Sequence, residues 1–237
     1  MACGYVMAAE LRACGVDFTF APCLDINFGR SQIIGERAFS NNPNVVTQLA
    51  LAVVQGLRLA GMSNCGKHFP GHGWVIADSH LELPVDDRPY DRLLFADLKP
   101  YRWMGQALDS VMAAHVLYPK VDSNPAGFSE HWLKKVLREE LHFTGVVFSD
   151  DLSMKGAVGV GNVTQRAEAA LQAGCDMLIQ CNDFEASDQL LGSLKFEDTA
   201  ERAERVKRLS PKGDAPTWKD LVKTALYKHS KDLIPAV

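Results

Sequence analysis

The segment KHFPGHGWVIADSH, residues 67–80, combines histidine, lysine and aspartate side chains with glycine and proline. Side chains of these types bind metal ions, contact phosphate groups or transfer protons, so three chemistries are open. Gly66, Gly71 and Gly73 match neither the P-loop nor the dinucleotide-binding fingerprint. A phosphate-binding loop is therefore the weakest of the three hypotheses.

Metal binding is the second hypothesis, because several barrel hydrolases hold metal ions with histidine and aspartate at strand ends. The residues that such a site would use are His68, His72, His80, His115 and Asp150. Pro70 and Gly71 separate the first two histidines, so this pair cannot share one helical face, the geometry that makes a good metal-binding pair. The spacing argues against a metal, but a metal-dependent barrel hydrolase stays an alternative.

Proton transfer is the third hypothesis, and it starts from Asp78-Ser79-His80. Side chains two apart in an extended segment point the same way, so Asp78 can accept a hydrogen bond from one ring nitrogen of His80. The carboxylate would then fix the tautomer of the ring, as the acid of a Ser-His-Asp triad does. The same pattern also occurs as a hydrogen bond that only structures a loop. The pattern alone leaves both interpretations open.

A second group of acidic residues lies in FSDDLSMKG, residues 148–156. Asp150 and Asp151 follow an apolar run that is typical of a buried strand, and two adjacent carboxylates there would need positive partners. Lys67 and Arg37 are available as partners. A simpler interpretation, an aspartate at the N-cap of the next helix, suits Asp151 better than Asp150.

Alternating apolar runs and helical periodicity predict the elements that position these residues. Strands are expected at 18–21, 62–67, 110–115, 145–149 and 176–180, and helices at 44–60, 88–98, 130–141 and 164–173. Each predicted strand ends in polar sequence, as at the active-site face of a β/α barrel. The sequence thus predicts a parallel α/β fold of the barrel type. Such a barrel needs eight strands, whereas about five are found here.

The composition restricts the class of protein and its partners. The chain has 237 residues, 47% of them hydrophobic, and a net charge of −4, so it can form a large core and has no general attraction to nucleic acid or anionic membranes. The six cysteines form no CxxC pairs, which favours buried thiols in a reducing cytoplasm. No apolar run approaches the roughly 20 residues of a membrane span, and the first residues do not resemble a signal peptide.

The C-terminal part of the sequence has a different pattern. After residue 194 only helical patterns remain, and they are rich in charge. We therefore expect a catalytic β/α-barrel domain over residues 1–194 and a helical region over 195–237 that packs on the barrel.

Several motifs together resemble the family 3 glycoside hydrolases. They are KHFPGHG with ADSH at 67–80, IGERAFS at 34–40 and GVVFSDDLSM at 145–154, and the likeness extends from about residue 1 to about residue 213. The motifs are most similar to those of the cytoplasmic single-domain β-N-acetylhexosaminidases of peptidoglycan recycling in bacteria. The resemblance implies release of terminal N-acetylglucosamine from muropeptide fragments that contain 1,6-anhydro-N-acetylmuramic acid. It implies a small carbohydrate substrate, and no metal or other cofactor.

The resemblance also implies roles for individual residues. Asp150 matches the nucleophile that forms a covalent glycosyl-enzyme, and His80 with Asp78 matches an acid/base dyad on a flexible loop. The residues that match sugar-binding positions are Arg37, Lys67 and His68. Adjacent residues of a regular strand face opposite sides, so contact of both Lys67 and His68 with one sugar requires the strand to be irregular. We therefore expect a strained or non-proline cis peptide near residues 67–69.

The sequence departs from the family's pattern at its N-terminal side. The family has three further strands and a motif similar to Val-Asp-Gln-Glu-Gly-Gly before the first strand found here, and three strands plus five make the eight of a closed barrel. We therefore expect an N-terminally truncated barrel with two unpaired sheet edges. Such a chain could be a monomer, could dimerise through those edges, or could be an inactive or merely sugar-binding remnant.

Overall fold

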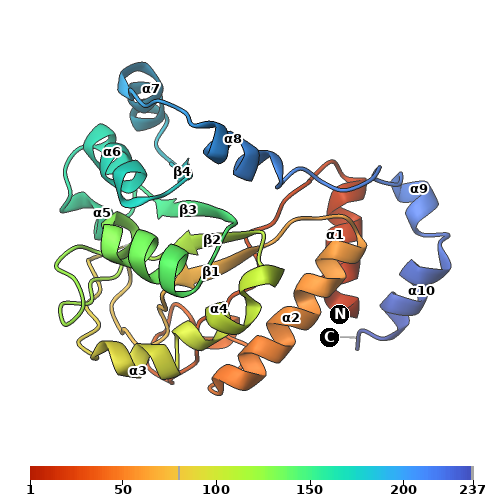
Figure 1. The fold of residues 1–237 in the computed structure, drawn as a ribbon. Coiled ribbons are helices and arrows are strands. Elements are labelled where there is room, and N and C mark those ends of the chain that lie inside the picture. The colour runs from red at the N-terminus through yellow and green to blue at the C-terminus, as the bar shows by residue number, and fades with distance from the viewer. Residues whose placement is uncertain (80, 236–237) are drawn as a thin grey trace.

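The computed structural model describes residues 1–79 and 81–235, and within them it shows a parallel sheet covered by helices (Figure 1). The strands are β1 (Cys65–Phe69), β2 (Ser110–Ala113), β3 (Val146–Asp151) and β4 (Met177–Ile179). They pair in chain order, β1-β2-β3-β4, and all three pairings are parallel. Parallel neighbours that follow each other along the chain require a crossover between them, and helices supply it here.

The helices flank the sheet and extend beyond it. The main ones are α1 (Ala2–Ala13), α2 (Pro43–Leu59), α3 (Tyr90–Phe95), α4 (Leu98–Met104), α5 (Lys155–Val158), α6 (Val163–Ala173), α7 (Phe184–Ser193), α8 (Ala200–Lys207), α9 (Trp218–Leu221) and α10 (Ala225–Asp232). A further helix, His131–Glu140, has the wider hydrogen bonding of a π-helix. None of the helices in the described ranges is both long and apolar enough to cross a bilayer.

Local sequence explains why α2 forms where it does. The side chain of Asn42 accepts a hydrogen bond from the backbone N–H of Asn44, and Pro43 occupies the first helical position, where its missing N–H costs nothing. Val46, Ala50 and Val54 recur at a spacing of four residues and are fully buried. This face joins Ala50 and Val54 to the main core, which includes Val111 of β2 and Val147 of β3.

Four of the five predicted strands are present, with shifted boundaries. The strand expected at 62–67 is observed at Cys65–Phe69, and the one expected at 110–115 ends at Ala113. Residues of β2 and the first half of β3 are buried on both faces, as expected for a parallel sheet between layers.

The strand predicted at 18–21 is not a regular strand. Phe18 and Cys23 form isolated bridges with Ser63 and Lys67, and the carbonyls of Ala21 and Pro22 accept backbone hydrogen bonds from β1. Pro22 has no N–H to donate, so the ladder is interrupted at that point. The segment thus runs beside β1, but the count of five strands is wrong: the described residues form a four-stranded sheet.

The helix predicted at 88–98 is also wrong in its extent. It starts at Tyr90, after Pro89, and ends at Phe95; a second helix then starts at Leu98. Arg88 and Asp97 lie outside both helices and form a buried ion pair of 2.8 Å. These two charged side chains thus pair with each other outside the helices, at the two ends of the range predicted as one helix.

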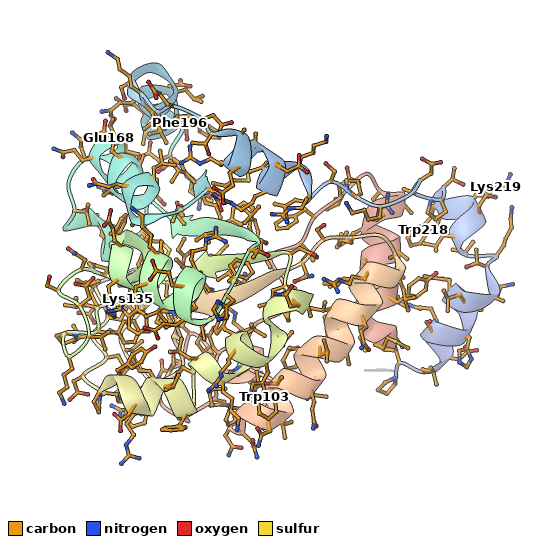
Figure 2. The ribbon with its side chains drawn as sticks, viewed as in Figure 1. Trp103, Lys135, Glu168, Phe196, Trp218 and Lys219 are labelled. Atoms are coloured by element: carbon orange, nitrogen blue, oxygen red, sulfur yellow. The ribbon has the colours of Figure 1, made fainter. Side chains whose placement is uncertain are left out.

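The C-terminal helices contact two different parts of the molecule. Val206 of α8 and Leu209 pack against buried residues of the sheet, including Val146 and Phe148. Helices α9 and α10 instead pack on α1, away from the sheet (Figure 1). Figure 2 shows Trp218 and Lys219 on α9 at the edge of the molecule farthest from the sheet. The proposed division at residue 194 stays a prediction.

Candidate active site

A cavity of about 290 Å³ opens at the carboxyl ends of the strands. Each strand of the sheet contributes to it at that end: Lys67 and His68 from β1, Met112 from β2, Asp150 from β3 and Ile179 from β4. The other lining residues are Phe20, Ile33, Ile34, Arg37, His72, Ser79, Asp151, Met154, Cys181 and Asn182. Polar and apolar side chains therefore share the wall, as is usual where a small polar ligand binds.

Four of the six predicted site residues line this cavity: Arg37, Lys67, His68 and Asp150. Arg37 ends a short 3₁₀ turn, Gly35–Arg37, and its guanidinium donates to the carbonyl of Ile33 at 3.3 Å. A fifth predicted residue, Asp78, directly precedes the cavity-lining Ser79. The sixth, His80, lies outside the described residues. Residues far apart in the sequence thus meet at one end of the sheet.

The expected irregularity at Lys67 and His68 is confirmed. The peptide bond between them is cis, and the pairing of β1 with β2 shifts register between Lys67 and Phe69. Both Lys67 and His68 line the cavity, although adjacent residues of a regular strand would face opposite sides.

Asp25 is a site residue that the sequence interpretation missed. It is 1% exposed, and its carboxylate accepts hydrogen bonds from Nδ1 of His68 at 2.7 Å and from the backbone N–H of His72 at 2.7 Å. Burial alone would raise the pKa of Asp25, but the charge and hydrogen bonds of the two histidines outweigh it and lower that pKa to about 2. The available signal was its place in APCLDIN, one of the polar segments that follow predicted strands.

The histidine of the PGHG sequence holds the segment that carries Asp78. Nε2 of His72 and the hydroxyl of Ser79 lie 3.0 Å apart, and both residues are 2% exposed. The backbone N–H of Gly156 donates to the carbonyl of Ser79 at 2.9 Å. Burial lowers the pKa of His72, so that its ring is neutral near pH 7. Ser79 is thus fixed from two sides against the cavity.

The glycines of KHFPGHG serve close packing. A side chain at Gly73 would place its Cβ 1.9 Å from the carbonyl oxygen of Ile26, and one at Gly71 would collide with Asp97. These two positions therefore require glycine for steric reasons. The packing explains the glycines without a phosphate ligand.

The two adjacent aspartates of β3 have different surroundings. Asp151 accepts hydrogen bonds from the backbone N–H groups of Ser153 and Cys181, and so ties the loop after β3 to the end of β4. It does not cap α5, whose N-cap is Met154, so the capping interpretation of Asp151 is wrong. Asp150 is half-buried in the cavity wall, and its Oδ1 accepts from the backbone N–H of Asp151 at 2.9 Å.

Of the histidines considered for a metal site, the three in the described part of the chain contact protein groups: His68 contacts Asp25, His72 contacts Ser79 and His115 contacts Asp151. His115 is fully buried, stacks on Phe128 and lies 3.2 Å from the carbonyl of Asp151. Within the described part of the chain, Cys23, Asp25 and His68 form a group of possible metal ligands. Burial raises the pKa of the Cys23 thiol far above neutrality, so this thiol keeps its proton and donates to Asp25 at 3.2 Å.

Comparison with known proteins identifies the family. The model of the glycosyl hydrolase family 3 N terminal domain matches residues 1–209. The chain belongs to this family. Its parallel strands and surrounding helices agree with the TIM-like α/β fold of that domain.

The relatives are beta-hexosaminidases and related structures. The chain is 54% identical over 231 residues to the Beta-hexosaminidase of Bordetella parapertussis. This alignment covers 97% of this chain and 65% of the relative. It is 52% identical over 207 residues to the Beta-hexosaminidase of Methylobacillus flagellatus, and this alignment covers 87% of this chain and 59% of the relative. The chain therefore spans about 65% or less of the length of these relatives.

Solved structures show the same likeness. NagZ from Neisseria gonorrhoeae, in complex with N-trifluoroacetyl-D-glucosamine, is 43% identical with a TM-score of 0.90, over 98% of this chain and 67% of NagZ. A family 3 beta-N-acetylglucosaminidase from a Paenibacillus species is 33% identical with a TM-score of 0.80, over 100% of this chain and 44% of that enzyme.

Proposed function

We propose that this family 3 protein is a β-N-acetylhexosaminidase that removes terminal β-linked N-acetylglucosamine with retention of anomeric configuration. The observation that carries the proposal is one cavity, lined by the carboxylate of Asp150 together with Arg37, Lys67 and His68. Retaining hydrolysis needs a carboxylate nucleophile near a proton donor, and a sugar needs hydrogen-bonding groups around its hydroxyls. The names of the matched relatives support the same activity.

Asp150 acts as the nucleophile in this proposal. Its carboxylate attacks the anomeric carbon, the bond to the leaving-group oxygen breaks, and a covalent glycosyl-enzyme forms. Water then attacks the same carbon and releases the sugar, which restores the free carboxylate. Arg37 and Lys67 line the same cavity and place positively charged groups near the site of the reaction.

The Asp78-His80 dyad supplies the proton transfers. A histidine with an ordinary pKa of about 6.5 can protonate the leaving oxygen and later take a proton from water near neutral pH. The described neighbour Ser79 lines the cavity and is held by His72 and Gly156, which supports a role for this segment in the reaction.

The substrate and the setting belong to the same proposal. Fragments of the type GlcNAc-1,6-anhydroMurNAc in the bacterial cytoplasm are the expected substrates, because the motifs are most similar to those of recycling enzymes. The sheet is proposed as part of an eight-stranded barrel, since its strands are parallel, follow chain order and end at one polar cavity.

Hydrolysis of an aryl β-N-acetylglucosaminide tests the proposal. Purified protein should release the aryl group, and proton NMR of the first product should show the β-anomer. Chelator treatment should leave the rate unchanged, whereas a metal-dependent hydrolase would lose activity. The matched aryl β-glucoside, which lacks the N-acetyl group, and NagZ from Neisseria gonorrhoeae serve as controls. Binding of N-acetylglucosamine without turnover, with NagZ active in parallel, would contradict the enzyme and favour a sugar-binding protein.

A further inference from the structure

We propose that Asp25 is a positioning residue that sets the hydrogen-bonding polarity of His68 and the path of the backbone from His68 to His72. The proposal rests on the proposed function, because His68 is taken to contact the sugar. Asp25 itself lies beneath the cavity wall and is almost completely buried.

One carboxylate holds four donors at this position. Oδ2 of Asp25 accepts from Nδ1 of His68 at 2.7 Å, from the backbone N–H of His68 at 3.2 Å and from the thiol of Cys23 at 3.2 Å. Oδ1 accepts from the backbone N–H of His72 at 2.7 Å. Both ends of the HFPGH segment are therefore fixed to the same side chain.

This contact determines which nitrogen of His68 carries the proton. An ionised carboxylate only accepts hydrogen bonds, so Nδ1 of His68 must be the protonated nitrogen. In the neutral ring the other nitrogen, Nε2, is then an acceptor on the side of the ring away from Asp25. An acceptor at this place in the cavity wall fits a sugar hydroxyl that donates.

The carboxylate stays ionised despite its burial. Three of the four donors belong to His68 and His72, which also line the cavity, and the charge and hydrogen bonds of these two residues lower the pKa of Asp25 to about 2. A buried carboxylate with this many donors is a strong hydrogen-bond acceptor across the whole pH range in which a glycosidase works. The tautomer of His68 is therefore set independently of pH as long as its ring is neutral.

The first measurement is nitrogen NMR of His68 in 15N-histidine-labelled wild-type protein at alkaline pH, where free imidazole is neutral. His68→Gln assigns its signals by their loss. A protonated Nδ1 and an unprotonated Nε2 are expected. The opposite tautomer would overturn the proposal, and this readout holds even if the protein does not hydrolyse any glycoside.

The second measurement uses Asp25→Asn. The amide has the shape of the carboxylate, but only its oxygen accepts, and its NH₂ group donates. Either end of the amide can face His68 and the fixed negative charge is lost, so both tautomers of His68 should be populated. The KM for an aryl β-N-acetylglucosaminide should rise about tenfold or more, with a smaller fall in kcat, because a group that binds the sugar acts in the ground state as well. An unchanged tautomer and an unchanged KM would overturn the proposal.

Asp86→Asn is the matched control. Asp86 is 0% exposed, and like Asp25 it accepts several hydrogen bonds, here from the side chain and backbone of Arg88. Its replacement should also destabilise the fold, but it should leave the tautomer of His68 and the KM unchanged. A similar rise in KM for both variants would show that Asp25 contributes only to stability. Cys23→Ala, which removes the thiol donor alone, should keep the wild-type tautomer.

Discussion

The two ends of the sheet both carry polar residues, but these residues have different partners. At the amino ends of the strands, Asp176 accepts from Arg138 at 2.8 Å, from Arg205 at 2.7 Å and from the backbone N–H of Val147. Asp109 accepts there from the backbone and side chain of Asn64. Each of these bonds joins segments that are far apart in the sequence, so the polar groups at this end complete the structure.

At the carboxyl ends, Asp150, Lys67 and Arg37 border a cavity instead. Their charged groups can reach a ligand there, and Asp25 beneath the wall fixes the orientation of His68. In TIM barrels, residues at the amino ends of the strands contribute stability, and residues at the carboxyl ends contribute the chemistry. Asp176 is surrounded by buried partners and completes the structure, whereas Asp150 and Asp151 both border the cavity. Asp151 also holds the loop after β3 against the end of β4, so Asp150 is the carboxylate that we propose to react.

Asp150→Ala should give the largest effect. The nucleophile is lost, so turnover should fall by roughly 10⁴-fold or more, while the melting temperature stays close to that of the wild type. Steady-state kinetics and thermal unfolding measure the two quantities. Azide should restore cleavage of an activated aryl substrate and give the α-glycosyl azide, since it attacks from the vacated side. Wild-type rates would exclude Asp150 as the nucleophile.

Asp176→Ala should lower the stability of the fold and leave the turnover rate unchanged. Arg138 and Arg205 would lose the carboxylate between them, and breaking a buried ion pair costs about 3–5 kcal/mol of unfolding free energy. Activity per folded molecule should be unchanged. Urea unfolding and active-site titration measure these effects. The control is Asp198→Ala, which removes the exposed partner of Arg202 and should cost less than about 1 kcal/mol.

The sequence predicted the strands, the helices and the residues around the cavity better than it predicted the contacts between distant segments. Strands β2 and β3 could be predicted because Val111, Val146 and Val147 lie in short apolar runs that are buried on both faces. The motifs placed Arg37, Lys67 and Asp150 at the site, and the structure brings these residues together. The helical spacing of apolar residues also predicted α2 and α6 to within one residue of their observed bounds.

The rest depends on contacts that local patterns do not contain. Asp25 contacts His68 and His72 across more than forty positions of the chain, so its role could not be inferred from its neighbours. The ends of α3 and α4 were missed for a more local reason: Pro89 precedes the first turn of α3, and Arg88 pairs with Asp97 outside both helices. At Asp25 the tertiary partners decide the structure, and these lie far away in the sequence.

Lys67→Met should give an intermediate effect at the cavity end. Loss of a charged hydrogen-bonding group costs about 1.5–3 kcal/mol, which is roughly a ten- to hundredfold fall in kcat/KM, and stability should not fall with it. Kinetics with an aryl β-N-acetylglucosaminide measure the change. The exposed Lys155 at the start of α5 provides the control, because Lys155→Met should keep wild-type kinetics. Loss of folding in Lys67→Met alone would make Lys67 a structural residue and weaken the contrast between the two ends.

Arg58→Ala should give the smallest effect and tests the amino end of the sheet. Arg58 pairs with Asp109 at 3.2 Å, but the two side chains are 47% and 27% exposed, so solvent screens the pair. Asp109 keeps its hydrogen bonds from Asn64, so only about 0.2–1 kcal/mol of unfolding free energy should be lost. Urea unfolding at low and high salt should show that the difference from the wild type shrinks as salt rises. A fall in kcat/KM would mean that the amino end also serves catalysis, and the contrast between the two ends would then fail.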